Sequence, residues 1–158
     1  MKVLSVIFAR AGSKGMKNKC VSRIDGKMVA EYSIEYSLAL GKEVKTVVST
    51  DIDSLINYCK DNNIDYIMRD PKFCRDEVAI DGAVADAIEQ MGTNYEYFNL
   101  VYGNIATRYP DLFHQALNFL KEYKDYDAAI SMQNVEKYNP MWMFDYNENV
   151  LPLVTESH

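Results

Sequence analysis

The sequence KVLSVIF at residues 2–8 runs directly into ARAGSKGMKNK at residues 9–19. A continuous apolar run of this length is typical of a strand buried on both faces of a parallel sheet. The segment after it is rich in glycine and lysine, and we expect it to continue as a loop to about Lys27. Ligands of open α/β sheets bind beyond the carboxyl ends of the strands, so this loop is the first place to look for chemistry.

The rest of the chain alternates apolar runs with helical patterns. We expect further strands at residues 44–49, 64–68, 98–102 and 128–132. We expect helices at residues 28–40, after Asp51 or Asp53, from about Val84 to Met91, and from Pro110 onward. Strands that alternate with helices of these lengths pair in parallel through right-handed crossovers. The sequence therefore predicts a doubly wound α/β fold with a mostly parallel sheet.

Composition excludes several classes of protein. With 158 residues, 48% of them apolar, the chain has enough material for one core. No run approaches the roughly 20 apolar residues of a membrane span. The apolar segment at residues 3–9 is too short for a signal peptide, so we expect a cytoplasmic protein. A net charge of −6 argues against nucleic acid as a partner.

Three cysteines, Cys20, Cys59 and Cys74, stand far apart without CxxC spacing. They predict reduced structural thiols rather than a zinc site or a disulfide framework. His114 and His158 have no liganding partners nearby in sequence, so we expect no metal site within the chain.

Residues 9–19, called the cradle below, combine two features of a phosphate site. Gly12 and Gly15 let the backbone bend close to a ligand and point N–H groups inward, and Ser13 adds a hydroxyl donor. Four cations stand within ten residues: Arg10, Lys14, Lys17 and Lys19. The spacing fits neither GxxxxGK[ST] nor GxGxxG. The cradle predicts a polyphosphate site; the alternative is a solvated basic loop.

The cradle after its strand, followed by VVSTD at residues 47–51, resembles the acylneuraminate (CMP-sialic acid) cytidylyltransferases. The similarity continues through RDPKFCRDEVAIDGAVADAIEQMG at residues 69–92 and NLVYGNIATR at residues 99–108. The resemblance implies a Rossmann-like nucleotidyltransferase fold. It also implies attack of a nonulosonic-type sugar acid on CTP, with CMP-sugar and pyrophosphate as products and Mg²⁺ as cofactor.

The resemblance assigns roles to individual residues. Those implied to be catalytic are Arg10, Lys19 and Asp51, although Asp51 also fits the N-cap of the next helix. Those implied to bind the nucleotide are Ala9, Ala11, Gly12, Ser13, Lys14, Gly15, Arg69 and Asp76. Those implied to face the sugar are Tyr102, Asn104 and Arg108.

Some residues depart from the family pattern. Cys20 stands where the family has asparagine, and Val78, Ala79 and Ile80 stand where it often has small hydroxyl residues. Residues 102–108 keep only the final arginine of the family's Gln-Pro-Thr-Ser-Pro-Leu-Arg loop. These departures leave open a sugar that is a relative of sialic acid rather than sialic acid itself.

The resemblance also implies an organisation. Residues 1–135 would form the nucleotide-binding domain, and residues 136–158 would begin an arm used in dimerisation and on the sugar side. The magnesium-binding aspartates would lie beyond residue 158, so we expect this chain to bind CTP yet turn over poorly. The cluster MWMF at residues 141–144 fits a partner-facing patch or a packed strand.

Three other functions stay open at this stage. The first is a nucleotidyltransferase that uses another sugar or another nucleoside triphosphate. The second is a nucleotide-binding domain without catalysis. The third is a small α/β domain that serves only in the assembly of a larger complex. This reading is disfavoured because four cations around two glycines have no packing role.

Overall fold

The structure is a computed structural model that describes residues 2–12, 16, 18–75, 78–132, 144–146 and 150–152. Two compact units divide the chain, Met1–His114 and Gln115–His158. Within the described residues no helix is both long enough and apolar enough to cross a bilayer.

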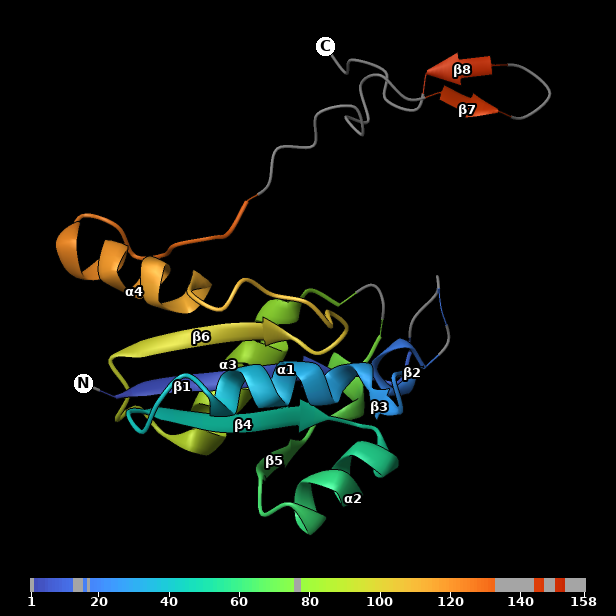
Figure 1. Cartoon of the computed structure of the whole chain (residues 1–158), viewed down its shortest axis with the longest axis horizontal. Coiled ribbons are helices and arrows are strands. Elements are labelled where there is room, and N and C mark those ends of the chain that lie inside the picture. Colours follow the sequence, from blue (N-terminus) through green and yellow to red (C-terminus); the bar gives the residue numbers. More distant parts are fainter. Residues whose placement is uncertain are drawn as a thin grey trace. The chain divides into compact units, whose positions relative to one another are not determined.

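The first unit is built on a four-stranded parallel sheet (Figure 1). Its strands in sheet order are β5 (Asp65–Met68), β4 (Val44–Thr50), β1 (Val3–Ala9) and β6 (Tyr97–Tyr102). Every residue of β1 is buried, which is what its uninterrupted apolar run predicts. Strands β4 and β5 lie on one side of β1, and the chain then crosses over so that β6 pairs with the other side of β1. The order therefore reverses beside β1, between β1 and β6.

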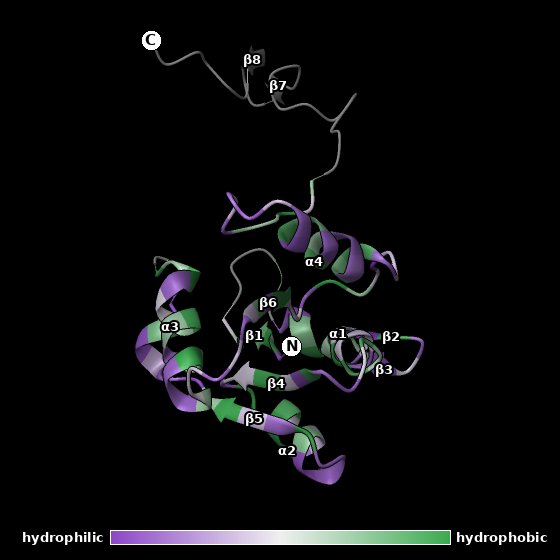
Figure 2. Ribbon diagram, turned by 90° about the vertical axis from the view of Figure 1, so that its left-hand side faces the viewer, coloured by the Kyte–Doolittle hydropathy of each residue, from purple (hydrophilic) through white to green (hydrophobic). Residues whose placement is uncertain are grey.

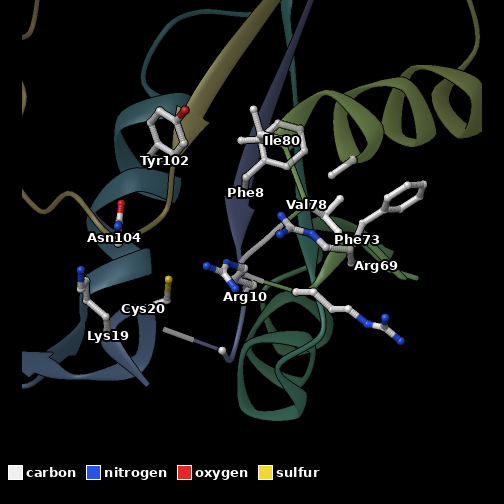
Figure 3. Close-up of a pocket in the computed structure, with 13 residues that line it drawn as sticks. Phe8, Arg10, Lys19, Cys20, Arg69, Phe73, Val78, Ile80, Tyr102 and Asn104 are labelled. Carbon is white, nitrogen blue, oxygen red and sulfur yellow. The ribbon is translucent and has the colours of Figure 1, made fainter. Parts of the chain in front are cut away.

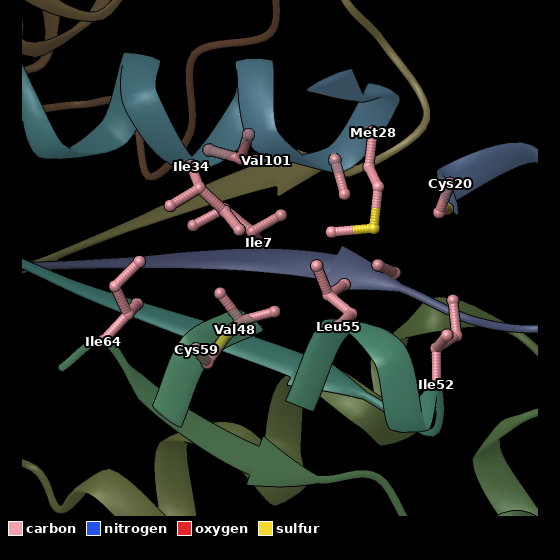
Figure 4. Close-up of a cluster of buried hydrophobic side chains, with 12 residues drawn as sticks. Ile7, Cys20, Met28, Ile34, Val48, Ile52, Leu55, Cys59, Ile64 and Val101 are labelled. Carbon is pink, nitrogen blue, oxygen red and sulfur yellow. The ribbon is translucent and has the colours of Figure 1, made fainter. Parts of the chain in front are cut away.

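Helices cover both faces of this sheet (Figure 2). Helices α1 (Val29–Leu38) and α2 (Asp53–Asp61) lie on one face, and α3 (Ile80–Met91) lies on the other. The first face packs a core that includes Ile7, Ile34 and Leu55 (Figure 4). The second packs Val6 and Phe8 of the sheet against Ala83 and Ala87 of α3. The predicted doubly wound α/β fold is confirmed.

The connection from β1 to α1 is more ordered than the expected loop. It contains a short 3-10 turn, η1 (Lys19–Val21), and a hairpin of β2 (Arg23–Ile24) and β3 (Lys27–Met28). Asp25 and Gly26 form the hairpin turn with φ of 49° and 82°. An Asp-Gly pair between two short strands favours this turn because both central residues need positive φ.

Two expectations about the later part of the chain are wrong. Residues 128–132 are not a strand; Ile130 and Met132 are 83% and 92% exposed. A short apolar run becomes a strand only where a neighbour offers a ladder, and no other described segment pairs with this one. Helix α4 (Leu112–Glu122) begins two residues after Pro110, which lies in a turn before it.

The arm expected at residues 136–158 lies outside the described residues, apart from two short backbone segments. These are β7 (Phe144–Tyr146) and β8 (Val150–Pro152), which pair antiparallel within the second unit.

Candidate functional site

A cleft of about 270 Å³ opens at the carboxyl ends of β1 and β6, where the strand order reverses (Figure 3). Ligands of doubly wound sheets bind at this kind of switch point. The residues that line the cleft are Phe8, Arg10, Gly12, Lys19, Cys20, Arg69, Phe73, Arg75, Val78, Ile80, Ala83, Tyr102 and Asn104.

The charge of this cleft is opposite to that of the chain. Four of its lining residues are Arg10, Lys19, Arg69 and Arg75, and none of the described lining residues is acidic. The whole chain carries a net charge of −6. Grouping cations costs free energy because like charges repel one another. A group of cations in an acidic protein is therefore typical of a site for an anionic ligand.

Arg10 is placed by the end of β1. It is the first residue after the strand, and its Nη1 donates to the carbonyl oxygen of Cys74 at 3.0 Å. Figure 3 shows Arg10 between Lys19 and Cys20 on one side and Arg69 and Phe73 on the other. Arg10 therefore lies between the two sides of the cleft, and its catalytic role stays a prediction.

Arg69 is the most enclosed cation of the site, with only 6% of its surface exposed. Its Nη2 and Nε donate to the carbonyl oxygen and hydroxyl of Ser49 at 3.1 and 3.3 Å. Its guanidinium also lies 5.3 Å from the centre of the Phe8 ring, a cation–π contact. Burial lowers the pKa of Arg69, and the nearby Arg10 cation acts in the same direction. Arginine nevertheless stays charged in proteins, so Arg69 supplies a fixed cation.

Lys19 and Cys20 come from η1, which forms the opposite side of the cleft. The Cys20 thiol is buried. Burial raises the pKa of this thiol, whereas the backbone N–H group of Arg10 and the cations of Arg69 and Lys19 act to lower it. Cys20, where the sequence departs from the family pattern, thus lies in the site itself.

The described part of the cradle runs along the floor of the cleft. Ala9 ends β1 and is buried, and the backbone N–H of Ala11 is donated to Oδ1 of Asp51 at 2.8 Å. Gly12 lines the cleft, and a Cβ there would lie 3.4 Å from Nη1 of Arg10. Other predicted nucleotide-binding residues lie outside the described residues: Ser13, Lys14, Gly15 and Asp76.

Asp51 is close to the cleft but does not line it. It is not the N-cap of α2, because that position is Ile52 and no side chain caps the helix. Thr50 instead accepts the N–H of Ile52 through its hydroxyl, at 3.1 Å. The Asp51 carboxylate is used to hold the cradle through Ala11.

The predicted sugar-side residues separate into two groups. Tyr102 and Asn104 line the cleft from the end of β6. Arg108 does not; its Nη1 donates to the Ser33 hydroxyl at 2.9 Å and to the Ile105 carbonyl oxygen at 2.8 Å. Its guanidinium lies 5.5 Å from the centre of the Tyr36 ring. In this structure Arg108 fastens the loop after β6 to α1.

Sequence reasoning gave no role to several residues that line the cleft: Phe8, Phe73, Arg75, Val78, Ile80 and Ala83. Val78 and Ile80 were visible only as departures from the family pattern. Gly103 was also missed, although a Cβ there would lie 2.9 Å from that of Ala9. Such a close approach between two strand ends leaves no signal in a single sequence.

No group of three or more His, Cys, Asp or Glu residues that could hold a metal ion occurs among the described residues. His114 lies in α4, where its ring meets the Phe113 ring edge-on at 5.2 Å, and His158 lies outside the described residues. The cleft lining, without a carboxylate among its described residues, does not fit a magnesium ion held by protein ligands.

Parallel strands, helices on both faces and a cationic cleft at the switch point define a doubly wound α/β protein built to bind an anion. Comparison with known families gives a more specific answer. Residues 4–149 match the family described as cytidylyltransferase. The chain belongs to the cytidylyltransferase family, which confirms the resemblance drawn from the cradle and the segments after it.

Individual relatives agree with this assignment. An N-acylneuraminate cytidylyltransferase of Escherichia coli O18:K1:H7 is 24% identical over 136 residues, covering 86% of this chain and 32% of the relative. One from Streptococcus agalactiae serotype V is 27% identical over 140 residues, covering 87% and 33%. The chain therefore spans about a third of the length of the curated relatives it matches.

A solved structure with the same fold is a CMP:2-keto-3-deoxy-manno-octonic acid synthetase complexed with CTP. The TM-score is 0.64 at 19% identity, over 77% of this chain and 48% of that one. A cytidylyltransferase from Leptospira borgpetersenii serovar Hardjo-bovis matches with a TM-score of 0.61 at 18% identity, over 77% and 50%.

Proposed function

We propose that this chain forms the nucleotide-binding part of an enzyme that activates a sialic-acid-like sugar acid with CTP. A sugar hydroxyl attacks the α-phosphorus of CTP, and the bond to the β-phosphate breaks. The products are the CMP-sugar and pyrophosphate. Membership of the cytidylyltransferase family and the names of the relatives support this proposal.

The observation that carries the proposal is the charge of the cleft. Four cations and no described carboxylate line a space at the switch point of the sheet. A nucleoside triphosphate is the kind of ligand that this arrangement favours, because it carries several negative charges along a short chain of phosphates. Transfer from such a ligand depends mainly on positioning and on neutralising charge in the transition state.

Arg10 and Lys19 are the groups we propose for the transferring phosphate. They belong to the two ends of the cradle, and both line the cleft. A fixed cation acts on the charge that develops as the phosphorus is attacked, without having to reorganise. The backbone amides of the cradle, with the Ser13 hydroxyl, would hold the remaining phosphates.

The cleft has two further sides with different chemistry. Phe73, Val78, Ile80 and Ala83 form an apolar wall from η2 (Pro71–Phe73) to the start of α3. We assign this wall, with Arg69, to the nucleoside. Tyr102 and Asn104 at the end of β6 bring a hydroxyl and an amide, and we assign them to the sugar acid.

Mg²⁺ belongs to this proposal only through the resemblance. No described residue of the cleft offers it a carboxylate, so a magnesium ion would depend on the phosphates and on groups outside the described residues. The cations of the cleft act on the phosphates directly.

A pyrophosphate-release screen tests the proposal. Each of CTP, UTP, ATP and GTP is combined with a panel of nonulosonic and related sugar acids, with Mg²⁺ present. Pyrophosphate release that requires both CTP and a sugar acid is the expected outcome. Release with another nucleotide, or without a sugar, would assign the site to a different transferase or to a hydrolase. Because this chain alone is expected to turn over poorly, the screen is repeated with the chain continued toward the length of its relatives. Nucleotide binding without release there too would favour the binding domain without catalysis.

A further inference from the structure

Gly82 lies in the first turn of α3, a position that glycine does not favour. Glycine is among the poorest helix formers, because fixing its backbone costs more conformational freedom than for any other residue. Its φ is not positive, so no unusual backbone conformation calls for glycine here. The explanation lies in the side chain that packs against it.

The ring of Phe73 occupies the space that a side chain at residue 82 would fill. A Cβ on Gly82 would lie 2.7 Å from Cε1 and 2.9 Å from Cδ1 of that ring, closer than carbon atoms pack. Phe73 is the last residue of η2, and its half-buried ring packs against the core that contains Ala83 and Ala87 of α3. The ring therefore rests on the bare backbone of the helix.

This contact joins the two elements that build the apolar wall of the cleft. Phe73 lines the cleft from η2, whereas Ile80 and Ala83 line it from the first turn of α3. Figure 3 shows Phe73 and Val78 on the side of the cleft where Arg69 lies. The depth at which the ring sits against the helix therefore sets the width of the cleft on this side.

The turn that carries Phe73 is held by its own hydrogen bonds. Oδ1 of Asp70 accepts the backbone N–H of Lys72 at 2.9 Å, and the backbone N–H of Phe73 donates to the carbonyl oxygen of Asp70, also at 2.9 Å. The Lys72 ammonium lies 4.6 Å from the centre of the Phe73 ring. Because the backbone of the turn is fixed in this way, a Cβ on Gly82 would displace the ring rather than the turn.

We propose that Gly82 and Phe73 form a specificity-determining pair for the nucleoside. Phe73 supplies an apolar surface for the base, and Gly82 is a positioning residue that leaves room for its ring. The proposal rests on the proposed function in one respect, namely that the anion in the cleft carries a nucleoside. Arg10 and Lys19 lie elsewhere in the cleft, so a displaced ring should weaken the hold on the nucleoside and not on the phosphates.

The chain offers a matched set of variants. Gly82→Ala adds the Cβ that would meet the ring. Phe73→Leu removes the ring and keeps an apolar side chain, so that a Cβ on residue 82 then has room. Phe98→Leu is the control, because Phe98 packs against the same core as Phe73 and does not line the cleft.

Calorimetry with two ligands separates the nucleoside from the phosphates. CTP carries both, and methyl triphosphate carries the same phosphate charge without the nucleoside. We expect Gly82→Ala and Phe73→Leu each to weaken CTP about 10-fold, within the range for a base that loses contact with an aromatic side chain. Affinity for methyl triphosphate should not change. Phe98→Leu should lower the melting temperature and leave both affinities unchanged.

The double variant shows whether Gly82 acts through the ring. If it does, adding Gly82→Ala to Phe73→Leu causes no further loss of CTP affinity, because leucine leaves room for the new Cβ. An equal further loss would overturn the proposal, as would unchanged CTP affinity in either single variant or a parallel loss for methyl triphosphate. If Gly82→Ala does not fold, the proposal requires that the double variant folds and binds CTP like Phe73→Leu.

Failure of the proposed function looks different. Another nucleoside triphosphate would then bind as tightly as CTP, and the same variants would weaken it in the same pattern. If no nucleotide binds more tightly than methyl triphosphate, the proposal for the pair is overturned, whereas the pyrophosphate-release screen still decides the proposed function.

Discussion

Arg10 and Arg69 bring two guanidinium groups to one cleft by different means. Arg10 is held through backbone groups, namely the carbonyl of Cys74 and the strand end that precedes it. Arg69 is buried among Ser49 and the Phe8 ring. Arg69 is therefore a fixed part of the wall, whereas Arg10 is the group whose removal should affect chemistry more than folding.

We expect Arg10→Ala to lower the rate of transfer about 100-fold or more, the usual cost of removing one donor that acts on transition-state charge. The melting temperature should change little, because Arg10 is only half-buried. Pyrophosphate release at saturating CTP and sugar acid measures the rate. Arg23→Ala is the control, because Arg23 lies in the exposed hairpin and not in the cleft. A rate within a few-fold of the unmodified protein would remove Arg10 from the mechanism.

Two glycines of the site should respond differently to the same substitution. In Gly103→Ala the new Cβ would lie 2.9 Å from the Cβ of Ala9 and 3.1 Å from the Phe8 carbonyl oxygen. Overpacking of this kind costs about 1–3 kcal/mol of the free energy of unfolding. In Gly12→Ala the nearest atom is at 3.4 Å, an ordinary contact, so stability should be kept while phosphate affinity falls. Urea unfolding and CTP calorimetry check the pair; equal stability of the two variants would contradict it.

The residue scale also shows what a single sequence can reveal of a site. Arg10 and Lys19 could be predicted because glycines and cations crowd together in the cradle within an acidic chain. Arg75 and Phe73 could not, because they reach the cleft only through the path of η2 between β5 and α3. The role of Gly103 depends on how closely two strand ends approach, a tertiary property.

At the scale of elements, the loop after β6 is fastened to α1 by one planar side chain. Arg108 reaches the hydroxyl of Ser33 and the carbonyl oxygens of Tyr102 and Ile105. The hydroxyl of Ser33, itself buried, lies 3.1 and 3.0 Å from the same two carbonyl oxygens and can donate its one proton to either of them. Tyr102 and Asn104 belong to the segment that is held in this way, so the sugar side of the cleft depends on α1.

We expect Arg108→Lys to loosen this loop almost as much as Arg108→Ala does. Lysine keeps the charge but lacks the planar fork that serves several acceptors at once. Hydrogen exchange of the loop amides should rise in both variants, and the protein should lose about 0.5–1.5 kcal/mol of stability, the usual net contribution of a hydrogen bond. Phosphate affinity should stay close to that of the unmodified protein. Full protection of the loop in Arg108→Lys would show that charge alone holds it.

Elements were predictable where burial alone specifies them. β1 and β4 carry long apolar or β-branched runs, and both appear within a residue of the expected ranges. The hairpin of β2 and β3 was missed because its strands are two residues each and its signal is a single Asp-Gly pair. The strand predicted at residues 128–132 was wrong for the opposite reason, because strand propensity without a partner strand does not make a strand.

At the scale of the whole molecule, thermal stability gives a direct test of nucleotide choice. We expect CTP to raise the melting temperature more than ATP or GTP at equal concentration, because a ligand that binds only the native state stabilises it. The gain is about 2.7 kcal/mol when the ligand is present at 100 times its Kd. Thermal unfolding with each nucleotide measures it, and the gain should shrink in Arg10→Ala. Equal protection by CTP, ATP and GTP would mean that the base is not recognised.

The four cations of the cleft should make nucleotide binding sensitive to other anions in solution. A hollow with four positive side chains and no described carboxylate attracts whatever small anion is abundant, such as phosphate, sulfate or chloride. A nucleotide must then displace a resident ion, so its measured affinity is a competition and not a single binding event. Apparent Kd values should be weaker in phosphate buffer than in an organic buffer of the same ionic strength. In a living cell, the inorganic phosphate pool would set how readily the site responds to a change in nucleotide supply.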